Sequence, residues 1–223
     1  MVKNTFIAVS LLFLLAGCYI RIGDRFEVRS LFNKKAEAKV RWEEEQSIAF
    51  APETLLRTKT AFGKITVTGA DVNECHVHAV ITAQAPHEEK AQEIADQVSL
   101  RLQPEDAGKT LVVTLDKPKL PRSCSVFATY HITLPQQAHL YLETSFGAIT
   151  LKNTTGTIWA KTSHGEVRGE DLTGSSVELR TSFGKTSHGP VIVDFTSQSS
   201  PTLQAQLETS FGEIKCTVPP SFA

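Results

Sequence analysis

Apolar and polar residues alternate along much of the chain from residue 47 onward, which is the pattern of strands with one buried face. Segments 47–52 and 55–83 follow this pattern, and glycines mark turns within it. Two further alternating segments, 110–116 and 125–135, are separated by loops that contain proline and glycine. The pattern predicts strands whose inward side chains include Ile65, Val67, Val77, Ala79 and Ile81.

Helical spacing replaces this alternation near residues 86–99. Pro86 suits the first turn of a helix, and the carboxylates of Glu88 and Glu89 favour its N-terminal dipole. Apolar residues at helical spacing predict one packing face, made by Ala91, Ile94, Ala95 and Val98. We therefore expect one short helix in an otherwise all-β chain.

From Leu140 onward the chain is periodic, with glycines at 147, 156, 165, 174 and 184 and strand-like runs between them. Two glycine intervals make about 18 residues, and short β-rich repeats with glycine corners are typical of a β-solenoid. The sequence predicts a single-stranded parallel β-helix in which successive turns of the chain pair with each other. The expected inward residues are Ile149, Leu151, Ile158, Ala160, Val177 and Leu179, and the expected outward residues are Thr150, Lys152, Thr157, Trp159, Glu178 and Arg180.

One phrase recurs within these repeats. Thr-Ser-Phe-Gly or Thr-Ser-His-Gly stands at 144–147, 162–165, 181–184, 186–189 and 209–212, and Thr-Ala-Phe-Gly stands at 60–63. With Leu142 inward, period two places Thr144 and Phe146 inward, and Gly147 allows the positive φ of a corner. Stacking then predicts ladders of threonines and of aromatic rings, including Phe62 if the first strands join the stack. The alternative is an outward aromatic strip that stacks on sugars.

The N-terminal sequence MVKNTFIAVSLLFLLAGC has the organisation of a secretory signal. Lys3 precedes an apolar run at 6–16, which is shorter than the roughly 20 residues that span a bilayer. The run ends in Leu-Ala-Gly-Cys, which resembles the lipobox of bacterial lipoproteins. The resemblance implies a signal peptide at 1–17 and a lipid on Cys18. The segment at 18–45 is rich in charge and has no clean strand period, so we expect it to act as a tether. The alternative is an ordinary signal peptide, or an uncleaved anchor with a chance cysteine.

Composition, charge and cysteine content exclude some classes of function. The chain is 41% apolar and 21% charged, as expected of a folded domain, and its formal net charge is -1. That charge argues against a nucleic-acid-binding protein, which needs a basic surface. Besides Cys18 the chain has Cys75, Cys124 and Cys216, in no spacing that indicates zinc. An exported chain permits a disulfide, with Cys75–Cys124 as one candidate, and buried free thiols are the other interpretation.

Residues 46–223 resemble the adhesin-like domain of bacterial envelope proteins known as DUF4097. The resemblance rests on the phrases TAFGKITVTG and TSFGAITLKNTTG, on a helix followed by LVVTL and YHITLP, and on the repeats LETSFGAITLKNTTGTIWAKTSHGEVRGEDLTG. In that family an asparagine commonly precedes the glycine, where this chain has Phe or His. The resemblance implies a right-handed, single-stranded parallel β-helix with no established catalytic activity.

No catalytic motif stands in the sequence: there is no G-x-S-x-G elbow, phosphate loop or G-x-G-x-x-G. Glu143 and Glu208 share one phase, so a carboxylate pair of a carbohydrate-active enzyme remains an alternative. His164 and His188 share the corner phrase, but a metal site needs further ligands, and we interpret both as replacing Phe. We expect no catalytic residue, no metal and no cofactor, and the sequence identifies no ligand-binding residue.

These features predict a non-enzymatic, lipid-anchored cell-envelope protein whose β-solenoid serves as a binding or scaffold surface. The expected partners are the membrane, through Cys18, and an envelope protein or glycan, and nucleic acid is not expected. Tyr19 stands where family usage places the Asp of inner-membrane retention, so the outer membrane is favoured in a host with two membranes. The alternative is a self-assembling module. We expect the ends of the stack to be capped by segment 46–135 and by CTVPPSFA at 216–223, whose prolines donate no ladder bonds.

Overall fold

The chain forms two β-sheets and one α-helix within the residues that the structure, a computed structural model, describes: 19–22, 26–27, 38–183, 191–195 and 203–218. The ten-stranded sheet contains, in spatial order, β1 (Tyr19–Ile22), β3 (Ala38–Ala49), β6 (Glu74–Ala85), β9 (Ser125–Pro135), β5 (Ile65–Ala70), β11 (Ile149–Thr154), β13 (Val167–Leu172), β15 (Val191–Phe195) and β17 (Ile214–Thr217), with β2 (Phe26–Glu27) beside β3. The seven-stranded sheet contains β16 (Gln204–Thr209), β14 (Ser176–Phe183), β12 (Ile158–His164), β10 (His139–Phe146), β4 (Leu55–Phe62), β8 (Thr110–Asp116) and β7 (Ser99–Glu105). The predicted all-β class is confirmed.

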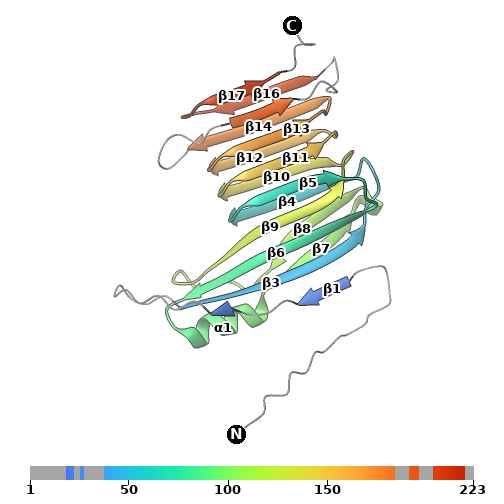
Figure 1. Cartoon of the computed structure of the whole chain (residues 1–223). Helices are drawn as coiled ribbons and strands as arrows, with labels where there is room; N and C mark the ends of the chain where they lie inside the picture. The colour runs from blue at the N-terminus through green and yellow to red at the C-terminus, as the bar shows by residue number, and fades with distance from the viewer. Residues whose placement is uncertain (1–18, 23–25, 28–37, 184–190, 196–202, 219–223) are drawn as a thin grey trace.

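Consecutive strands from β10 to β17 alternate between the two sheets, and each pairs in parallel with the strand two places later. Leu140 lies opposite Ile158 and Ile149 lies opposite Val167, so the paired residue numbers differ by 18 in both sheets. This difference confirms the repeat length read from the glycines. We call one strand of each sheet, taken as consecutive along the chain, a rung, and Figure 1 shows the rungs stacked toward the C-terminus.

The first rung comes from a distant part of the sequence. β4 pairs in parallel with β10, and β5 pairs in parallel with β11. Phe62 therefore lies opposite Phe146, and Ile65 lies opposite Ile149. The Thr-Ala-Phe-Gly phrase thus joins the stack, and β3 together with the chain between β5 and β10 forms the base of the molecule.

The base lies largely within segment 46–135, which the sequence predicted to cap the stack, and most of its strands pair antiparallel rather than in parallel like the rungs. β3, β6 and β9 pair antiparallel with one another in that order, and β7 pairs antiparallel with β8. The physical reason is that β3, β6 and β9 contain no glycine at which the chain could turn a corner, so each continues as one long strand. The domain boundary expected between residues 45 and 46 falls inside β3.

The core lies between the two sheets and follows the predicted alternation. The inward side chains predicted for the first strands and for the rungs all have exposed fractions of 1% or less: Ile65, Val67, Val77, Ala79, Ile81, Ile149, Leu151, Ile158, Ala160, Val177 and Leu179. Burial of each large aliphatic side chain contributes about 1.5–3 kcal/mol to folding. Thr150, expected on the outer face, is also buried.

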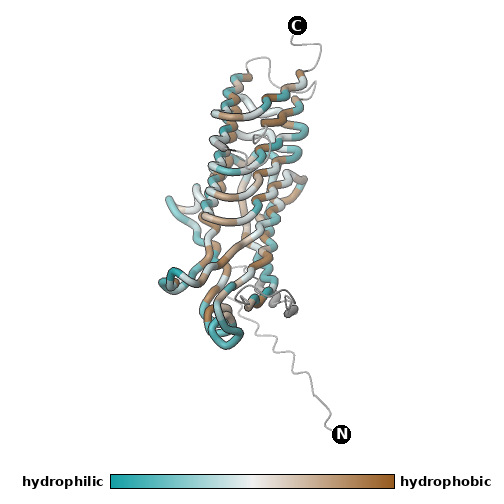
Figure 2. Tube along the Cα trace, turned by 90° about the vertical axis from the view of Figure 1, so that its left-hand side faces the viewer, coloured by the Kyte–Doolittle hydropathy of each residue, from teal (hydrophilic) through white to brown (hydrophobic). Residues whose placement is uncertain are grey.

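The predicted helix is confirmed as α1 (Glu88–Gln97). It packs against β3 and β6 through the predicted face, since Ala91, Ile94 and Ala95 are buried. In Figure 1 this helix lies at the base, at the opposite end from the last rung. Figure 2 shows the long, narrow stack after a 90° turn, with hydrophobic and hydrophilic stretches alternating along its strands. Of the described helices, none combines the length and hydropathy that a membrane span requires.

Candidate binding surface

The corner of each rung is built from a threonine and a glycine. In three corners the threonine hydroxyl donates a hydrogen bond to the carbonyl oxygen of the corner glycine one rung nearer the base, which satisfies a buried hydroxyl at a bend. The bonds are Thr144 Oγ1 to Gly63 O at 3.3 Å, Thr162 Oγ1 to Gly147 O at 2.9 Å and Thr181 Oγ1 to Gly165 O at 2.9 Å. The threonine ladder expected from the sequence is therefore confirmed.

Glycine is required at these corners by space as well as by conformation. Gly147 has φ of 155°, and a Cβ on it would lie 2.0 Å from the carbonyl oxygen of Gly63. The same close approach recurs one rung further, where a Cβ on Gly165 would lie 2.1 Å from Gly147 O. The corner residues therefore specify the stacking of the backbone.

The rings of Phe62, Phe146 and Phe211 lie outside the stack, which corrects the prediction that Phe146 faces inward. Phe146 is 46% exposed, Phe62 is 38% exposed and Phe211 is 55% exposed. β10 ends at Phe146 and the chain turns at Gly147, so the alternation along the strand no longer fixes the side of its last residue. The inward place at the corner belongs to Thr144, which is 1% exposed.

Two exposed rings, Phe62 and Phe146, and two half-buried rings, Phe127 and His164, form a column that we call the aromatic ridge. Phe62 and Phe146 stack with centroids 5.2 Å apart, and Phe146 and His164 stack at 4.6 Å. Phe127 meets Phe62 edge to face at 5.4 Å. The predicted aromatic ladder is therefore present, and His164 occupies the place of a Phe as interpreted from the sequence.

The ridge presents ring edges rather than ring faces. Phe146 is flanked by Phe62 on one side and by His164 on the other, with interplanar angles of 12° and 10°. A sugar ring stacks on an open aromatic face, and both faces of Phe146 are covered. The exposure expected of an outward aromatic strip is thus observed, but the geometry does not suit stacking on sugars.

A second aromatic pair lies on the outer face of the seven-stranded sheet. The rings of Tyr141 and Trp159 are parallel within 8°, with centroids 4.3 Å apart. Trp159 was expected to be the exposed aromatic residue, and it is half-buried. This pair contributes about 0.5–1.5 kcal/mol to the pairing of β10 with β12.

A row of charged residues runs beside this pair, with one residue from each of the strands β4, β10, β12, β14 and β16. The strand register places Lys59, Glu143, Lys161, Arg180 and Glu208 in line. Glu143 is held by Lys59 at 3.0 Å, and Glu208 by Arg180 at 3.3 Å.

Two strands lie between Glu143 and Glu208, so the two carboxylates are about 14 Å apart at a strand spacing of about 4.8 Å. Inverting glycosidases need roughly 6.5–9.5 Å and retaining ones about 5–5.5 Å. The distance is therefore too long for the catalytic pair that the sequence left as an alternative.

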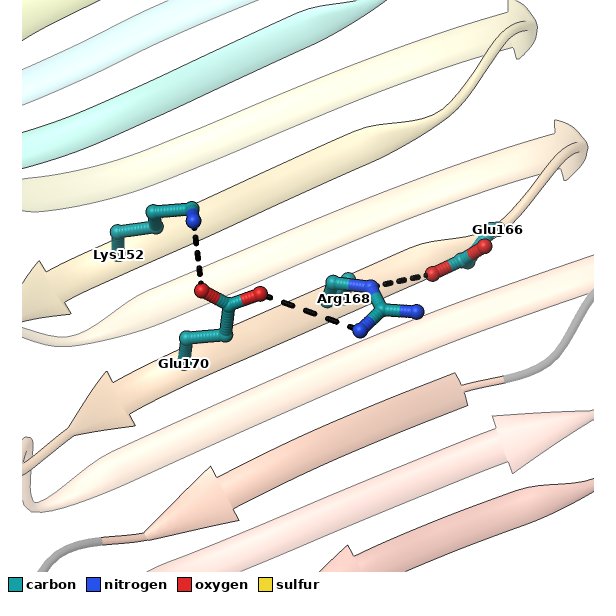
Figure 3. Close-up of polar contacts among 4 residues, drawn as sticks. All are labelled: Lys152, Glu166, Arg168 and Glu170. Atoms are coloured by element: carbon teal, nitrogen blue, oxygen red, sulfur yellow. Dashed lines mark hydrogen bonds and ion pairs between the residues drawn. The ribbon is translucent and has the colours of Figure 1, made fainter.

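The outer face of the ten-stranded sheet carries another charged group (Figure 3). Lys152 contacts Glu170 at 2.7 Å, and Arg168 contacts Glu170 at 3.9 Å and Glu166 at 2.7 Å. The hydrogen bond to Glu166 raises the pKa of Arg168 above its ordinary value. Because every carboxylate here has a cationic partner and is partly solvated, the group forms a polar face.

Three histidines gather on the same sheet near the base. His78 and His131 stack at 5.8 Å, His78 Nε2 lies 3.0 Å from Glu43 Oε2, and His76 Nδ1 lies 2.9 Å from Ser47 Oγ. Burial lowers the pKa of His131, and the positive charges of His78 and Lys64 act in the same direction.

His76 and His78 lie two residues apart on one face of β6, and antiparallel pairing with β9 brings His131 beside them, a contact that sequence spacing alone does not reveal. Among the described residues no cluster of His, Cys, Asp and Glu could hold a metal ion. His188, the proposed counterpart of His164, lies outside the described residues.

The three described cysteines are free thiols. Cys75 is the second residue of β6, whereas Cys124 precedes Ser125, which lies opposite Gln84 at the other end of β6. Nine residues of strand separate the two positions, or about 30 Å, and the Cα atoms of a disulfide lie within about 7 Å. The Cys75–Cys124 disulfide is therefore excluded, and burial raises the pKa of the Cys75 thiol to about 12.

No protein-family model and no curated protein matches the chain. Among solved structures, a "putative cell adhesion protein" from Clostridium sporogenes aligns at 12% identity and a TM-score of 0.36, covering 78% of this chain and 99% of that one. A "putative adhesin" from Parabacteroides distasonis aligns at 8% and 0.27, and a "putative lipid binding protein" from the same species at 11% and 0.25. Both cover 78% of this chain and 96% of their own. Similarities at this level carry no conclusion about what the chain binds.

Proposed function

We propose that the chain is a non-enzymatic, lipid-anchored protein of the bacterial cell envelope, of the adhesin-like DUF4097 type. Its stacked rungs form a β-solenoid, and the aromatic ridge of that solenoid binds a protein partner in the envelope. The single observation that carries the proposal is the ridge, because its rings remain 38% and 46% exposed at Phe62 and Phe146 while stacking in register.

The ridge is favoured over the other surfaces by its chemistry. Exposed apolar groups that form a continuous patch, rather than standing singly, mark interaction sites on soluble proteins. Four rings from β4, β9, β10 and β12 form such a patch, whereas the outer sheet faces carry mutually paired charges. Ring edges pack well against apolar side chains, so a protein surface fits the ridge better than a glycan does.

The observed geometry favours binding over catalysis. The carboxylates that could act as acid and base are paired with Lys or Arg, and Glu143 and Glu208 lie too far apart to act together. The repeated corner residues, whose abundance suggested a binding motif, are used for stacking the rungs. The ridge is the part of the repeated phrase that exposes large apolar rings among the described residues.

The chain is proposed to attach to the membrane through its N-terminus. A signal peptide at 1–17 is removed, Cys18 carries the lipid, and the following segment links the lipid to the sheets, with the outer membrane favoured in a host with two membranes. Support comes from the Leu-Ala-Gly-Cys sequence alone, since these residues lie outside the described part of the chain. Cys18→Ala is expected to abolish labelling by a fatty-acid probe and to leave an uncleaved precursor, and persistent labelling would refute the assignment.

Binding by the ridge is tested by substitution with a matched control. Phe146→Ser removes the centre of the ridge, and Val72→Ser removes another exposed apolar side chain, 39% exposed, outside it. When the full chain is captured from native envelopes under mild detergent, a protein recovered with the native chain should be lost with Phe146→Ser and kept with Val72→Ser. Equal recovery with both variants would contradict binding through the ridge.

A further inference from the structure

In the last rung, inward-facing residues are exposed to solvent, whereas the residues at the equivalent positions of the earlier rungs are buried. Ile214 of β17 is 44% exposed, whereas its register neighbour Val191 and the next residue in that row, Val167, are both 0% exposed. Leu207 of β16 is half-buried, whereas Leu179 beside it is 0% exposed. The core of the stack is therefore open at this end.

The backbone is open at the same place. β16 and β17 are the terminal strands of the two sheets, and each pairs with one strand only among the described residues. Each edge thus presents unpaired N–H and C=O groups beside exposed apolar side chains. Such an edge is a template for another strand.

We propose that two copies of this chain join end to end through β16 and β17, related by a two-fold axis perpendicular to the stack. The axis makes each strand pair with its own copy in antiparallel orientation, which is the isologous contact of most homodimers. This inference does not depend on the aromatic ridge, which runs along the side of the stack rather than at its end.

The position of the axis follows from the corner that joins the two strands. Residues equally far from the centre of the 210–213 corner face each other across the core, so Leu207 lies across from Cys216. An axis through both positions pairs Leu207 with Leu207 of the second copy and Cys216 with Cys216 of the second copy. It also places Ile214 opposite Val218 of the second copy, and these two side chains are 44% and 55% exposed in the single chain.

Charge selects this position over a shift of one residue toward the corner. With the axis at Leu207 and Cys216, Glu208 lies opposite Gln206 of the second copy, and Lys215 lies opposite Thr217 of the second copy. A shift of one residue toward the corner places Glu208 opposite Glu208 of the second copy and Lys215 opposite Lys215 of the second copy. Like charges directly opposite each other destabilise a strand pair, so the edges are complementary to themselves in the unshifted register.

Cross-linking tests the register. Directly opposite residues of an antiparallel pair have Cα atoms about 4.5–5.5 Å apart, within the range of roughly 4.4–6.8 Å that a disulfide requires. Copper(II)-phenanthroline, which oxidises two adjacent thiols to a disulfide, is added to the full chain carrying Cys18→Ser in detergent. A covalent dimer is expected, kept by Cys124→Ser and abolished by Cys216→Ser. Absence of the dimer, or its persistence without Cys216, would overturn the proposed pairing.

Light scattering tests the association itself with two lysine substitutions on the same edges. Ile214→Lys places a charge in the apolar end and is tolerated in the single chain, where this side chain is already exposed. Gln206→Lys adds the same charge opposite Glu208 of the second copy, where it is accepted. We expect the mass of two chains for the native protein and for Gln206→Lys, and of one chain for Ile214→Lys. A native protein that stays single across a concentration series, or an unaffected Ile214→Lys dimer, would refute the proposal and leave a different partner at this end.

Partner binding by the aromatic ridge and end-to-end dimerisation can be tested independently. Ile214→Lys is expected to leave partner capture by the ridge unchanged, and Phe146→Ser is expected to leave the mass of two chains unchanged. A single substitution that abolished both would contradict their independence.

Discussion

The hydroxyl of Thr162 donates a hydrogen bond of 2.9 Å to the carbonyl oxygen of Gly147, the corner glycine of the preceding rung. Gly147 in turn leaves no room for a side chain beneath the Gly63 carbonyl, 2.0 Å from where its Cβ would be. The hydroxyl of Thr162 and the absence of a side chain on Gly147 together allow consecutive rungs to pack closely. The repeated Thr-x-x-Gly spacing is explained by this contact.

Removal of the threonine hydroxyl tests this contact. Thr162→Val keeps the shape of the side chain but removes the donor, and leaves the carbonyl of half-buried Gly147 without this hydrogen bond. We expect the free energy of unfolding to fall by about 1–2 kcal/mol, measured by urea denaturation. Thr157→Val, on an exposed position of the same rung, is the control and should change it by less than about 0.5 kcal/mol. Equal effects would show that the hydroxyl bond contributes nothing specific.

The glycine corner is tested by comparing two alanine substitutions. Gly147→Ala combines positive φ with a Cβ inside the Gly63 carbonyl, so we expect a loss of about 3 kcal/mol or more, or failure to fold. Gly108→Ala also has positive φ, 87°, but nothing lies within 4 Å of its Cβ, and it should cost only about 1 kcal/mol. Comparable losses in thermal unfolding at both positions would contradict the role of close rung stacking.

The histidine group near the base predicts a pH dependence. Burial lowers the pKa of His131 from its ordinary value of 6.5, with His78 and Lys64 acting in the same direction and Glu43 opposing them. The unfolded chain therefore binds this proton at a higher pH than the folded chain, and stability falls as the pH drops through 6.5. We expect a weaker loss of stability between about pH 7 and pH 5 in His131→Gln than in the native chain. Identical pH profiles would show that His131 does not contribute.

We expect the Cys75 thiol to be unreactive in the folded chain. The thiolate is the reactive form, and burial, together with the negative charge of Glu74, raises the pKa of this thiol to about 12. We expect a maleimide reagent to modify half-buried Cys124 in the native protein and to reach Cys75 only after denaturation, as read by mass spectrometry of peptides. Rapid native-state labelling of Cys75 would contradict its burial in the core.

Much of the fold could be predicted because alternation and glycine spacing are local signals. Strand bounds at 110–116 and 125–135, the helix near 86–99 and the inward residues of the rungs all follow from them. Whether a strand turns back in parallel or continues antiparallel depends on pairing between distant segments. The antiparallel base was therefore missed, and with it the contact between His78 and His131.

The candidate surface was predictable only in part. The sequence indicated that aromatic rings would stack at successive corners, and Phe62, Phe146 and His164 do. It placed the rings on the wrong side, because period two applies within a strand and Phe146 is the last residue of β10, where the backbone turns. A lipid on Cys18 stays a prediction, since that residue lies outside the described part of the chain.

Site-specific photo-crosslinking most directly tests whether the aromatic ridge binds a protein partner. A photoreactive phenylalanine analogue replaces Phe146 in one full chain and Val72 in another, and both are irradiated in intact cells. The two side chains are similarly exposed, at 46% and 39%. We expect one discrete adduct to an envelope protein from position 146 and none from position 72. No adduct from position 146, or the same adducts from both positions, would contradict binding by the ridge.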